Sequence, residues 1–303
     1  MNRPLRIGTR GSPLALAQAH MVAAALRSAH GWDEDRVEIV PITTTGDVVQ
    51  DRPLAEIGGK GLWTKELDRC LAAGDTDLSV HSMKDVETIR ADSLAVAAML
   101  PRADVRDRLI GAPSIAAIAQ GAVVGTSSPR RAAQLLRRRP DLQVVPIRGN
   151  VETRLRKVAE GEVAASLLAA AGLDRIGRGE VGTPVEDMLP APSQGAVGIE
   201  VLAGNAAVRD LVAAIDHPET HACVRAERRL LLALGGDCRS AVAALATMTA
   251  GRVTLRAEIL TADGREVEAG ETAFDPADGD APAALGRLLL DRASPALRAM
   301  FAG

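Results

Sequence analysis

Short apolar runs alternate with longer amphipathic stretches in the first third of the chain. The runs at Leu5–Thr9, Val37–Ile42 and Leu78–His81 include β-branched residues and predict strands. The stretches at Pro13–Arg27 and Leu62–Ala72 place apolar residues at helical spacing and predict helices. This alternation is typical of an α/β domain, in which helices cover a mainly parallel sheet.

The pattern stops near Leu100–Arg102, where an apolar run ends in a charged segment, and then starts again. The second series predicts strands at Val123–Gly125, Leu142–Ile147 and Val163–Leu168, and helices at Ser128–Arg138 and Val151–Glu160. A further strand, Ala196–Val201, follows a segment rich in proline and glycine. The sequence therefore predicts a second α/β unit after a hinge.

The last part of the chain has a different pattern. A helical stretch at Arg225–Leu234 ends at paired glycines. Two or three alternating strands follow between residues 241 and 274, of which Val253–Leu260 is the clearest, and one amphipathic helix is predicted at Pro282–Met300. This order predicts a small α+β domain.

Composition excludes several classes of function. With 303 residues and 47% apolar content the chain can bury a large core, divided over two or three domains. The net charge of -3 gives no basic field for nucleic acid, and no window approaches the uninterrupted apolar run of a membrane helix. The N-terminal sequence lacks the pattern of a signal peptide, so we expect a cytoplasmic protein without nucleic-acid or membrane partners.

The three cysteines are far apart and have no metal-type spacing, so neither a disulfide framework nor a metal site is expected. Cys70 and Cys223 lie on predicted helices and are expected in the core. Cys238 follows Gly235–Asp237 in a loop from which a thiol can reach a ligand. Its position alone leaves both a core thiol and a modified thiol open.

Polar side chains gather where the predicted strands end. His81, Ser82, Lys84 and Asp85 directly follow a buried strand, at the edge where open α/β sheets bind ligands. An alternative is that Asp85 caps a turn while Lys84 is solvated. The number of polar groups at one strand end favours a site.

Two further strand ends predict an anion site. Gly125–Arg131 combines hydroxyl groups, a helix N-terminus and two arginines, and Arg148-Gly149-Asn150 with Arg154 follows the next strand. By contrast, Arg137–Arg139 lie at a helix C-terminus, where cations need no ligand. The glycine-rich stretch at residues 58–61 lacks the Walker spacing and is interpreted as a loop that brings Lys60 and Trp63 near a pocket.

These segments closely resemble, in the same order, motifs of the porphobilinogen deaminases. The resemblance runs from residue 5 to about residue 240, and six motifs carry it: Ile7–Ala15, Gly58–Leu62, Val80–Val86, Gly125–Arg131, Arg148–Asn150 and Gln194–Glu200. Several collinear motifs are far more specific than any single one.

The resemblance implies two α/β domains like those of type II periplasmic binding proteins, with the active cleft between them, and a small α+β domain that carries a cofactor. On this basis we expect domains at residues 1–99 plus 195–216, residues 100–194 and residues 217–303. The implied activity is that of a transferase, which deaminates four porphobilinogen molecules, joins them head to tail and releases hydroxymethylbilane for haem biosynthesis. The resemblance also leads us to expect a monomer.

Residue roles follow from the same resemblance. Asp85 matches the catalytic aspartate, and Cys238 matches the cysteine that holds a dipyrromethane cofactor through a thioether. The other implied cofactor-binding residues are Lys84, Ser127, Ser128, Arg130, Arg131, Arg148 and Gly149. The implied substrate-binding residues are Arg10, Ser12, Lys60, Trp63, Arg154 and Gln194, and no metal ligand is implied.

The chemistry of this reaction explains the residue types. Each pyrrole carries an acetate and a propionate, so the growing product accumulates negative charges that arginines bind well. Loss of ammonia from porphobilinogen leaves an azafulvenium cation, which a nearby carboxylate such as that of Asp85 can stabilise.

The chain departs from the family pattern at four positions. Trp63 stands where phenylalanine is usual, Glu87 stands where proline usually follows the aspartate motif, Asp237 directly precedes Cys238, and Ala241 replaces a common proline. Three other classes remain as alternatives: a non-catalytic solute-binding protein, the effector domain of a regulator and a phosphoribosyltransferase. A solute-binding protein would be expected to carry a signal peptide, and a regulator would be expected to carry a helix-turn-helix region. A phosphoribosyltransferase would need a phosphate loop and magnesium-binding carboxylates.

Overall fold

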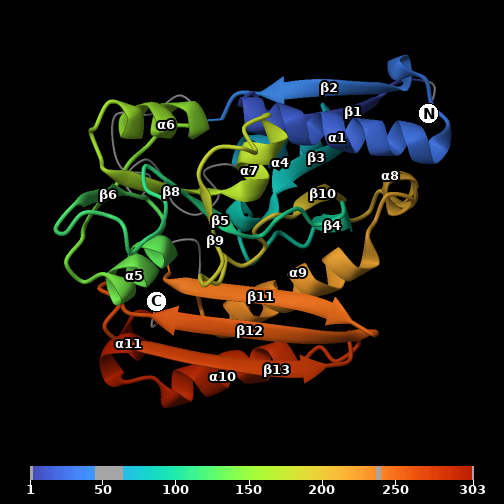
Figure 1. Cartoon of the computed structure of the whole chain (residues 1–303). Helices are drawn as coiled ribbons and strands as arrows, with labels where there is room; N and C mark the ends of the chain where they lie inside the picture. The colour runs from blue at the N-terminus through green and yellow to red at the C-terminus, as the bar shows by residue number, and fades with distance from the viewer. Residues whose placement is uncertain (1–2, 45–63, 237–239, 302–303) are drawn as a thin grey trace. The chain divides into compact units, whose positions relative to one another are not determined.

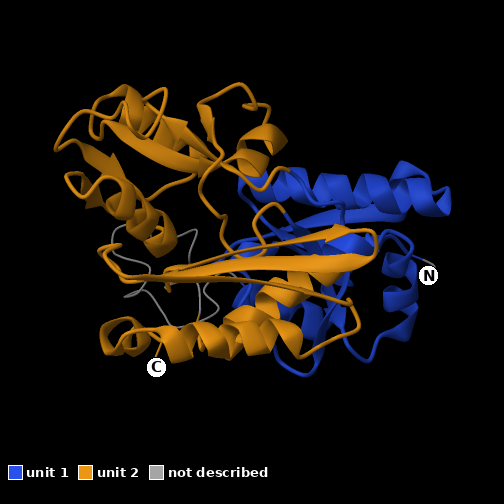
Figure 2. Cartoon of the chain, turned by 60° about the horizontal axis from the view of Figure 1, so that its bottom comes forward, with its two compact units in different colours: residues 1–103, 196–221 blue, residues 104–195, 222–303 orange. Residues whose placement is uncertain are grey.

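A computed structural model describes residues 3–44, 64–236 and 240–301 of the chain. The chain divides into two compact units, which Figure 2 distinguishes by colour. The first unit comprises residues 1–103 and 196–221, and the second comprises residues 104–195 and 222–303. Each unit is thus built from two separate stretches of sequence.

The first unit contains a five-stranded mixed sheet. Its strands are β1 (Leu5–Arg10), β2 (Val37–Ile42), β3 (Leu78–Ser82), β4 (Leu94–Met99) and β10 (Val197–Leu202), in the order β2-β1-β3-β10-β4. β1 pairs in parallel with β2 and β3, whereas β10 runs antiparallel to β3 and β4. The strand from the second stretch of sequence therefore completes the sheet of the first.

Helices cover this sheet through their apolar faces. The helices of the first unit are α1 (Pro13–His30), α4 (Lys65–Ala73) and α8 (Ala206–Ala213). Val22 of α1 and Val208 of α8 are fully buried in one core with Ile199 of β10, so both helices pack against the same face. α4 contacts β1, β3 and β10, and it buries Leu67 and Leu71.

The second unit begins with a sheet of the same arrangement. Its strands are β5 (Asp107–Ile110), β6 (Val123–Gly125), β7 (Gln143–Val145), β8 (Ala165–Ala169) and β9 (Thr183–Val185), in the order β7-β6-β8-β5-β9. β6 pairs in parallel with β7 and β8, and β5 runs antiparallel to β8 and β9. The helices that follow β6, β7 and β8 are α5 (Pro129–Arg138), α6 (Val151–Ala159) and α7 (Ala170–Arg175).

The C-terminal part of the second unit is an antiparallel meander covered by helices (Figure 1). Its elements are α9 (Pro218–Ala233), which belongs to this unit from Ala222 onward, β11 (Val242–Thr249), β12 (Arg252–Leu260), β13 (Val267–Phe274), α10 (Ala281–Arg292) and α11 (Pro295–Ala299). Leu230 of α9 and Leu289 of α10 are fully buried with Leu255 of β12, so one face of the meander forms a core with both helices.

The predicted fold class is confirmed, because two α/β sheets precede a small α+β part. The single helix predicted at Pro282–Met300 is wrong. Ala293 has extended backbone, Ser294 caps a new helix and Pro295 begins it, so α10 and α11 are separate. The short strands β5 and β9 were not predicted because three or four residues carry too little pattern.

The two units and the three predicted domains divide the chain differently. The unit boundaries after Ala103, Gly195 and His221 lie within five residues of the predicted domain boundaries. The second unit, however, combines the second sheet with the C-terminal meander. The division into three domains stays a prediction. None of the described helices combines the length and the apolar character needed to span a membrane.

Candidate active site

Asp85 lies in a short turn, residues 83–85, that directly follows strand β3. Asp85 is exposed, whereas Met83 and Val86 on either side of it are buried. The backbone N–H of Met83 donates to the carbonyl of Ala196 at 3.1 Å, and the N–H of Val86 donates to the carbonyl of Met83 at 3.3 Å. Asp85 is thus accessible, while the residues on either side of it are held in the core.

A small pocket brings Asp85 together with two other predicted site residues. The pocket has a volume of about 60 Å³, and Arg10, Ser12, Ser82 and Asp85 contribute to its lining. β1 and β3 are parallel neighbours, so the residues that follow them meet at one edge of the sheet. The hydroxyl of Ser12 also accepts a hydrogen bond from the N–H of Ala15 at 3.3 Å, as the N-cap of α1.

An ionic network continues from this pocket into the core. His81 lines the same pocket, and its Nε2 lies 3.2 Å from Oε2 of the fully buried Glu200. Arg90 donates to both oxygens of the Glu200 carboxylate, at 2.8 Å each. Burial acts to raise the pKa of Glu200, but the nearby imidazole of His81 and the hydrogen bonds from Arg90 lower it to about 2. Glu200 is therefore ionised at neutral pH although it is buried.

In the second unit, predicted site residues lie on two loops that bind each other. The hydroxyl of Ser127, after β6, donates to the carbonyl of Ile147, after β7. Gly149 has a φ of 107°, and a Cβ at this position would lie 2.5 Å from the side chain of Thr153, so only glycine fits. Arg154 donates through Nε to the carbonyl of Gly149 at 3.0 Å. The parallel pairing of β6 and β7 therefore places these residues at neighbouring strand ends.

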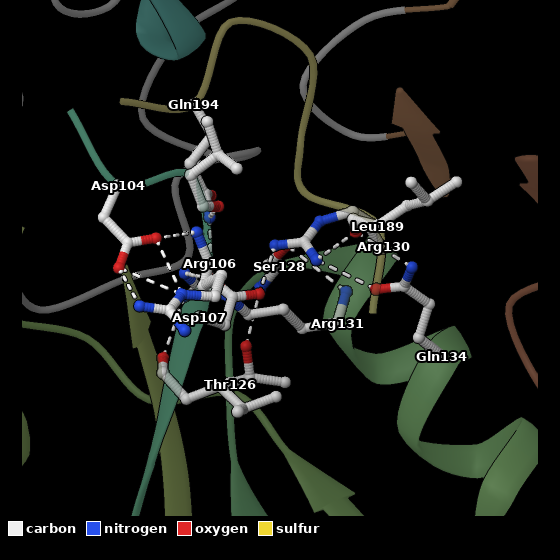
Figure 3. A network of polar contacts seen from close by, with 12 residues as sticks. Asp104, Arg106, Asp107, Thr126, Ser128, Arg130, Arg131, Gln134, Leu189 and Gln194 are labelled. Atoms are coloured by element: carbon white, nitrogen blue, oxygen red, sulfur yellow. Dashed lines mark hydrogen bonds and ion pairs between the residues drawn. The ribbon is translucent and has the colours of Figure 1, made fainter. Parts of the chain in front are cut away.

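Arg130 and Arg131 share one buried carboxylate, that of Asp107 (Figure 3). Both arginines lie in the first turn of α5, with exposed fractions of 2% and 5%. Asp107 accepts from Arg130 at 2.8 Å through Oδ2 and from Arg131 at 2.7 Å through Oδ1. The amide of Gln194 donates to the same Oδ1 at 2.9 Å. Asp107 is thus the common partner of three predicted site residues.

Gln134 extends this network to the C-terminal meander. Its Oε1 accepts from Arg130 at 2.9 Å, and its Nε2 donates to the carbonyl of Leu189 at 3.0 Å and to the carboxylate of Glu258 on β12. Arg131 in turn donates to the carbonyl of Leu167 at 2.8 Å. These contacts fix the orientation of both guanidinium groups.

The electrostatics of the cluster favour a ligand that carries carboxylates. Burial acts to raise the pKa of Asp107, but the two guanidinium groups lower it well below its usual range. Arginine keeps its proton in proteins, so both guanidinium groups are charged. Their Nε–H groups are buried and have no hydrogen-bond partner among the described residues. Two fixed, positively charged guanidinium groups that still have N–H donors available are suited to bind the carboxylates of a ligand such as a dipyrromethane.

Three predicted site residues, Cys238, Lys60 and Trp63, lie outside the described residues. Lys84 and Arg148 are half-buried at the strand ends where the sequence places them. Of the other two thiols, Cys223 is buried, as predicted, whereas Cys70 is only partly buried. Over residues 3–44, 64–236 and 240–301, no group of His, Cys, Asp and Glu side chains is arranged to hold a metal ion.

Sequence reasoning missed several residues that the structure places in these networks. Glu200 had a usable signal, because a carboxylate within an apolar strand needs a buried cationic partner. Asp107 and Arg90 had none, since nothing local distinguishes them from solvated charges. Arg175 was also missed: it donates to the carbonyl of Gly195 at 2.7 Å, and burial lowers its pKa.

Two family models match the chain. The model described as "Porphobilinogen deaminase, dipyromethane cofactor binding domain" matches residues 5–210, and "Porphobilinogen deaminase, C-terminal domain" matches residues 221–292. The chain is 56% identical to a porphobilinogen deaminase of Sphingopyxis alaskensis, covering 99% of this chain and 98% of that protein. It is 50% identical to one of Paracoccus denitrificans, covering 92% of this chain and 90% of that protein.

Among solved structures, the methionine-binding protein MetQ is similar at 15% identity with a TM-score of 0.43, covering 72% of this chain and 91% of that chain. The VFT2 domain of Bordetella pertussis BvgS is similar at 16% identity with a TM-score of 0.39, covering 70% of this chain and 86% of that chain. The fold class rests on the sheets described above and not on these distant similarities.

Proposed function

The chain belongs to the porphobilinogen deaminase family, and from this premise we propose how its residues divide the reaction. The reaction is that of a transferase: each porphobilinogen loses ammonia, and four units are joined head to tail on a dipyrromethane cofactor. Water then cleaves the bond to the cofactor, which releases hydroxymethylbilane for tetrapyrrole biosynthesis and leaves the dipyrromethane in place. In our proposal the first unit supplies the carboxylate that acts at the reacting carbon. The second unit supplies the arginines that bind the acid side chains of the pyrroles.

The observation that carries this proposal is the pocket that Asp85 shares with Arg10 and Ser12. Arg10 and Ser12 bind a carboxylate side chain of the substrate, which places the reacting carbon next to Asp85. The carboxylate of Asp85 stabilises the positive charge that develops as ammonia leaves. It then takes up the proton that the pyrrole α-carbon loses after coupling.

The second set of residues binds negative charge at fixed positions. Arg130 and Arg131 donate to pyrrole carboxylates, and their orientation is set by Asp107. Ser127, Ser128, Arg148, Gly149 and Arg154 contribute further donors to the same carboxylates. In the first unit, Lys84 is proposed as a further cofactor-binding residue. Gln194 acts on this site through Asp107, to which its amide donates.

Cys238 holds the dipyrromethane through a thioether in this proposal, and Lys60 and Trp63 contact the substrate. When bound, the dipyrromethane supplies the pyrrole carbon to which the first substrate unit is joined. We further propose that the protein works as a cytoplasmic monomer whose partner is its small substrate.

The mass of the purified full-length protein tests the proposal. We expect a mass higher than that of the polypeptide by one dipyrromethane, and we expect Cys238→Ser to have the polypeptide mass and to form no hydroxymethylbilane. Cys70→Ser is the matched control, because this thiol lies on helix α4, and it should keep the added mass. An unmodified wild-type protein, or an added mass that persists in Cys238→Ser, contradicts the proposed attachment.

A further inference from the structure

The segment that follows Asp85 forms an ionic contact through Glu87, at the position where the family resemblance leads us to expect a proline. Glu87, two residues after Asp85, accepts a hydrogen bond from Nη1 of Arg90 at 2.8 Å and another from the hydroxyl of Thr64 at 2.9 Å. Nη1 of Arg90 also donates to the hydroxyl of Thr64 at 3.3 Å. The three side chains therefore form a closed triangle of hydrogen bonds.

Arg90 is itself held rigidly by the core. It binds both oxygens of Glu200, which is fully buried, and it donates to Asp68 of α4 at 2.6 Å. The Arg90 side chain is only 12% exposed, and that of Glu87 is 23% exposed. A pair between a partly buried carboxylate and an already ordered guanidinium costs less side-chain entropy than a pair on the surface. Glu87 thus connects the segment after Asp85 to a fixed point.

The backbone next to Glu87 has the shape that a proline would impose. Val86 has a φ of -89° and a ψ of 131°, which is the extended conformation that a residue before proline adopts. Proline would stiffen this segment by fixing its own φ. The hydrogen bond between the Glu87 side chain and Arg90 restrains the same segment without fixing a backbone angle directly.

We propose that Glu87 is a positioning residue for Asp85, which it serves by holding the segment after the turn against Arg90. This inference rests on the proposed function, in which the exposed Asp85 acts on the reacting carbon. Burial of Met83 and its hydrogen bond to Ala196 fix the turn on one side. Burial of Val86 and the contact of Glu87 with Arg90 fix it on the other side.

The role predicts a specific kinetic signature. If Glu87 only orients Asp85, its loss slows the chemical step but leaves the groups that bind the substrate in place. We expect Glu87→Ala to lower kcat roughly 10-fold while KM changes less than about twofold, because small misplacements of a catalytic group slow the reaction steeply. The Arg90–Glu200 pair remains intact in this variant, so the fold and the covalent cofactor content should be preserved.

The Glu87→Pro variant distinguishes the positioning of Asp85 from a direct effect of the Glu87 charge on the reaction. It removes the carboxylate but restores stiffness at the same position, so we expect kcat to return to within about threefold of wild type. The matched control is Glu160→Ala, which removes the exposed pair between Arg156 of α6 and Glu160 at its C-cap and should leave kcat and KM unchanged. Intact mass and thermal unfolding of each full-length holoenzyme verify cofactor content and folding.

Two results would overturn the inference: a wild-type kcat for Glu87→Ala, or a Glu87→Pro variant as slow as Glu87→Ala. The proposed function is tested separately by Asp85→Asn in the same assay. An active Asp85→Asn would refute the role of Asp85 whatever the Glu87 variants do. An inactive Asp85→Asn together with a fully active Glu87→Ala would refute only the positioning role.

Discussion

The two units hold their functional side chains in opposite ways. Asp85 in the first unit is exposed and lies between the buried Met83 and Val86, whereas Arg130 and Arg131 in the second unit are buried and bind Asp107 directly. The difference follows from the tasks we assign to them. A carboxylate that stabilises a transient cation must meet the reacting carbon, but guanidinium groups that bind carboxylates can be fixed in advance by the protein. The comparison implies that the same substitution will have different consequences in the two regions.

The largest effects come from changing aspartate to asparagine in each region. Asp107→Asn leaves two buried guanidinium groups without their negative partner, and we expect the free energy of unfolding to fall by roughly 3–5 kcal/mol. Asp85→Asn should leave this free energy nearly unchanged because the side chain is exposed, yet it should lower kcat by roughly 10²–10⁴-fold. Urea unfolding and steady-state kinetics on both variants measure the contrast.

Glu160→Gln is a suitable control for this contrast, because Glu160 is exposed and pairs with the exposed Arg156 at the end of α6. It should change neither stability nor activity appreciably. If the variants at Asp85 and Asp107 lost the same free energy of unfolding, the proposed difference between an exposed catalytic side chain and a buried, ion-paired cluster would be refuted.

An intermediate effect is expected from acid, through the buried network next to the Asp85 pocket. The pKa of Glu200 is about 2 in the folded protein, whereas a solvated glutamate, as in the unfolded chain, has a pKa of 4.5, so unfolding takes up a proton between these values. Its stabilising contribution is complete above about pH 4.5 and is lost as the pH falls toward 2, with a slope of up to about 1.4 kcal/mol per pH unit. Urea midpoints measured from pH 6 to pH 3 should show this loss.

Glu200→Gln identifies the source of the acid sensitivity. The variant should be less stable than wild type at neutral pH, because Arg90 loses its buried charge partner, and its stability should fall less steeply with acid. A wild-type slope in Glu200→Gln would assign the acid sensitivity to other carboxylates, such as Asp107, whose pKa is also lowered.

The smallest effect concerns the helix that presents the arginine pair. The hydroxyl of Ser128 caps α5 by accepting from the N–H of Arg131 at 3.4 Å. Ser128→Ala should cost about 1 kcal/mol of stability, as the loss of an N-cap does. Intact mass measures whether the variant keeps its cofactor: we expect reduced loading, because Ser128 is proposed to donate to the same carboxylates. Full loading would restrict Ser128 to the capping role.

Much of the fold could be predicted from periodicity, because β1, α1 and β3 are long enough to show it. The failures have local physical causes. Pro295 divides a helix whose apolar pattern continues across it, and β9 has only three residues. The return of β10 to the first sheet depends on long-range pairing with β3 and β4, which no local pattern encodes.

The candidate site could be predicted only where its residues sit in motifs at strand ends. Asp85 was identified in this way, whereas Arg10 and Ser12 were named only through the family resemblance; the structure places all three around one pocket. Asp107 was not identified, because an aspartate in a short strand gives no sign that two arginines from α5 will surround it. The sequence thus indicates residues that meet a ligand better than it indicates the residues that hold them.

The central claim is that Asp85 acts at the reacting carbon while the arginines bind the carboxylates of the pyrroles. The mass of the protein during turnover tests this claim most directly. Wild-type holoenzyme given limited porphobilinogen should gain mass in discrete steps of one deaminated substrate unit. Asp85→Asn should carry the cofactor mass but gain the first step at least about 100-fold more slowly. Steps that accumulate at the wild-type rate in Asp85→Asn would contradict the account.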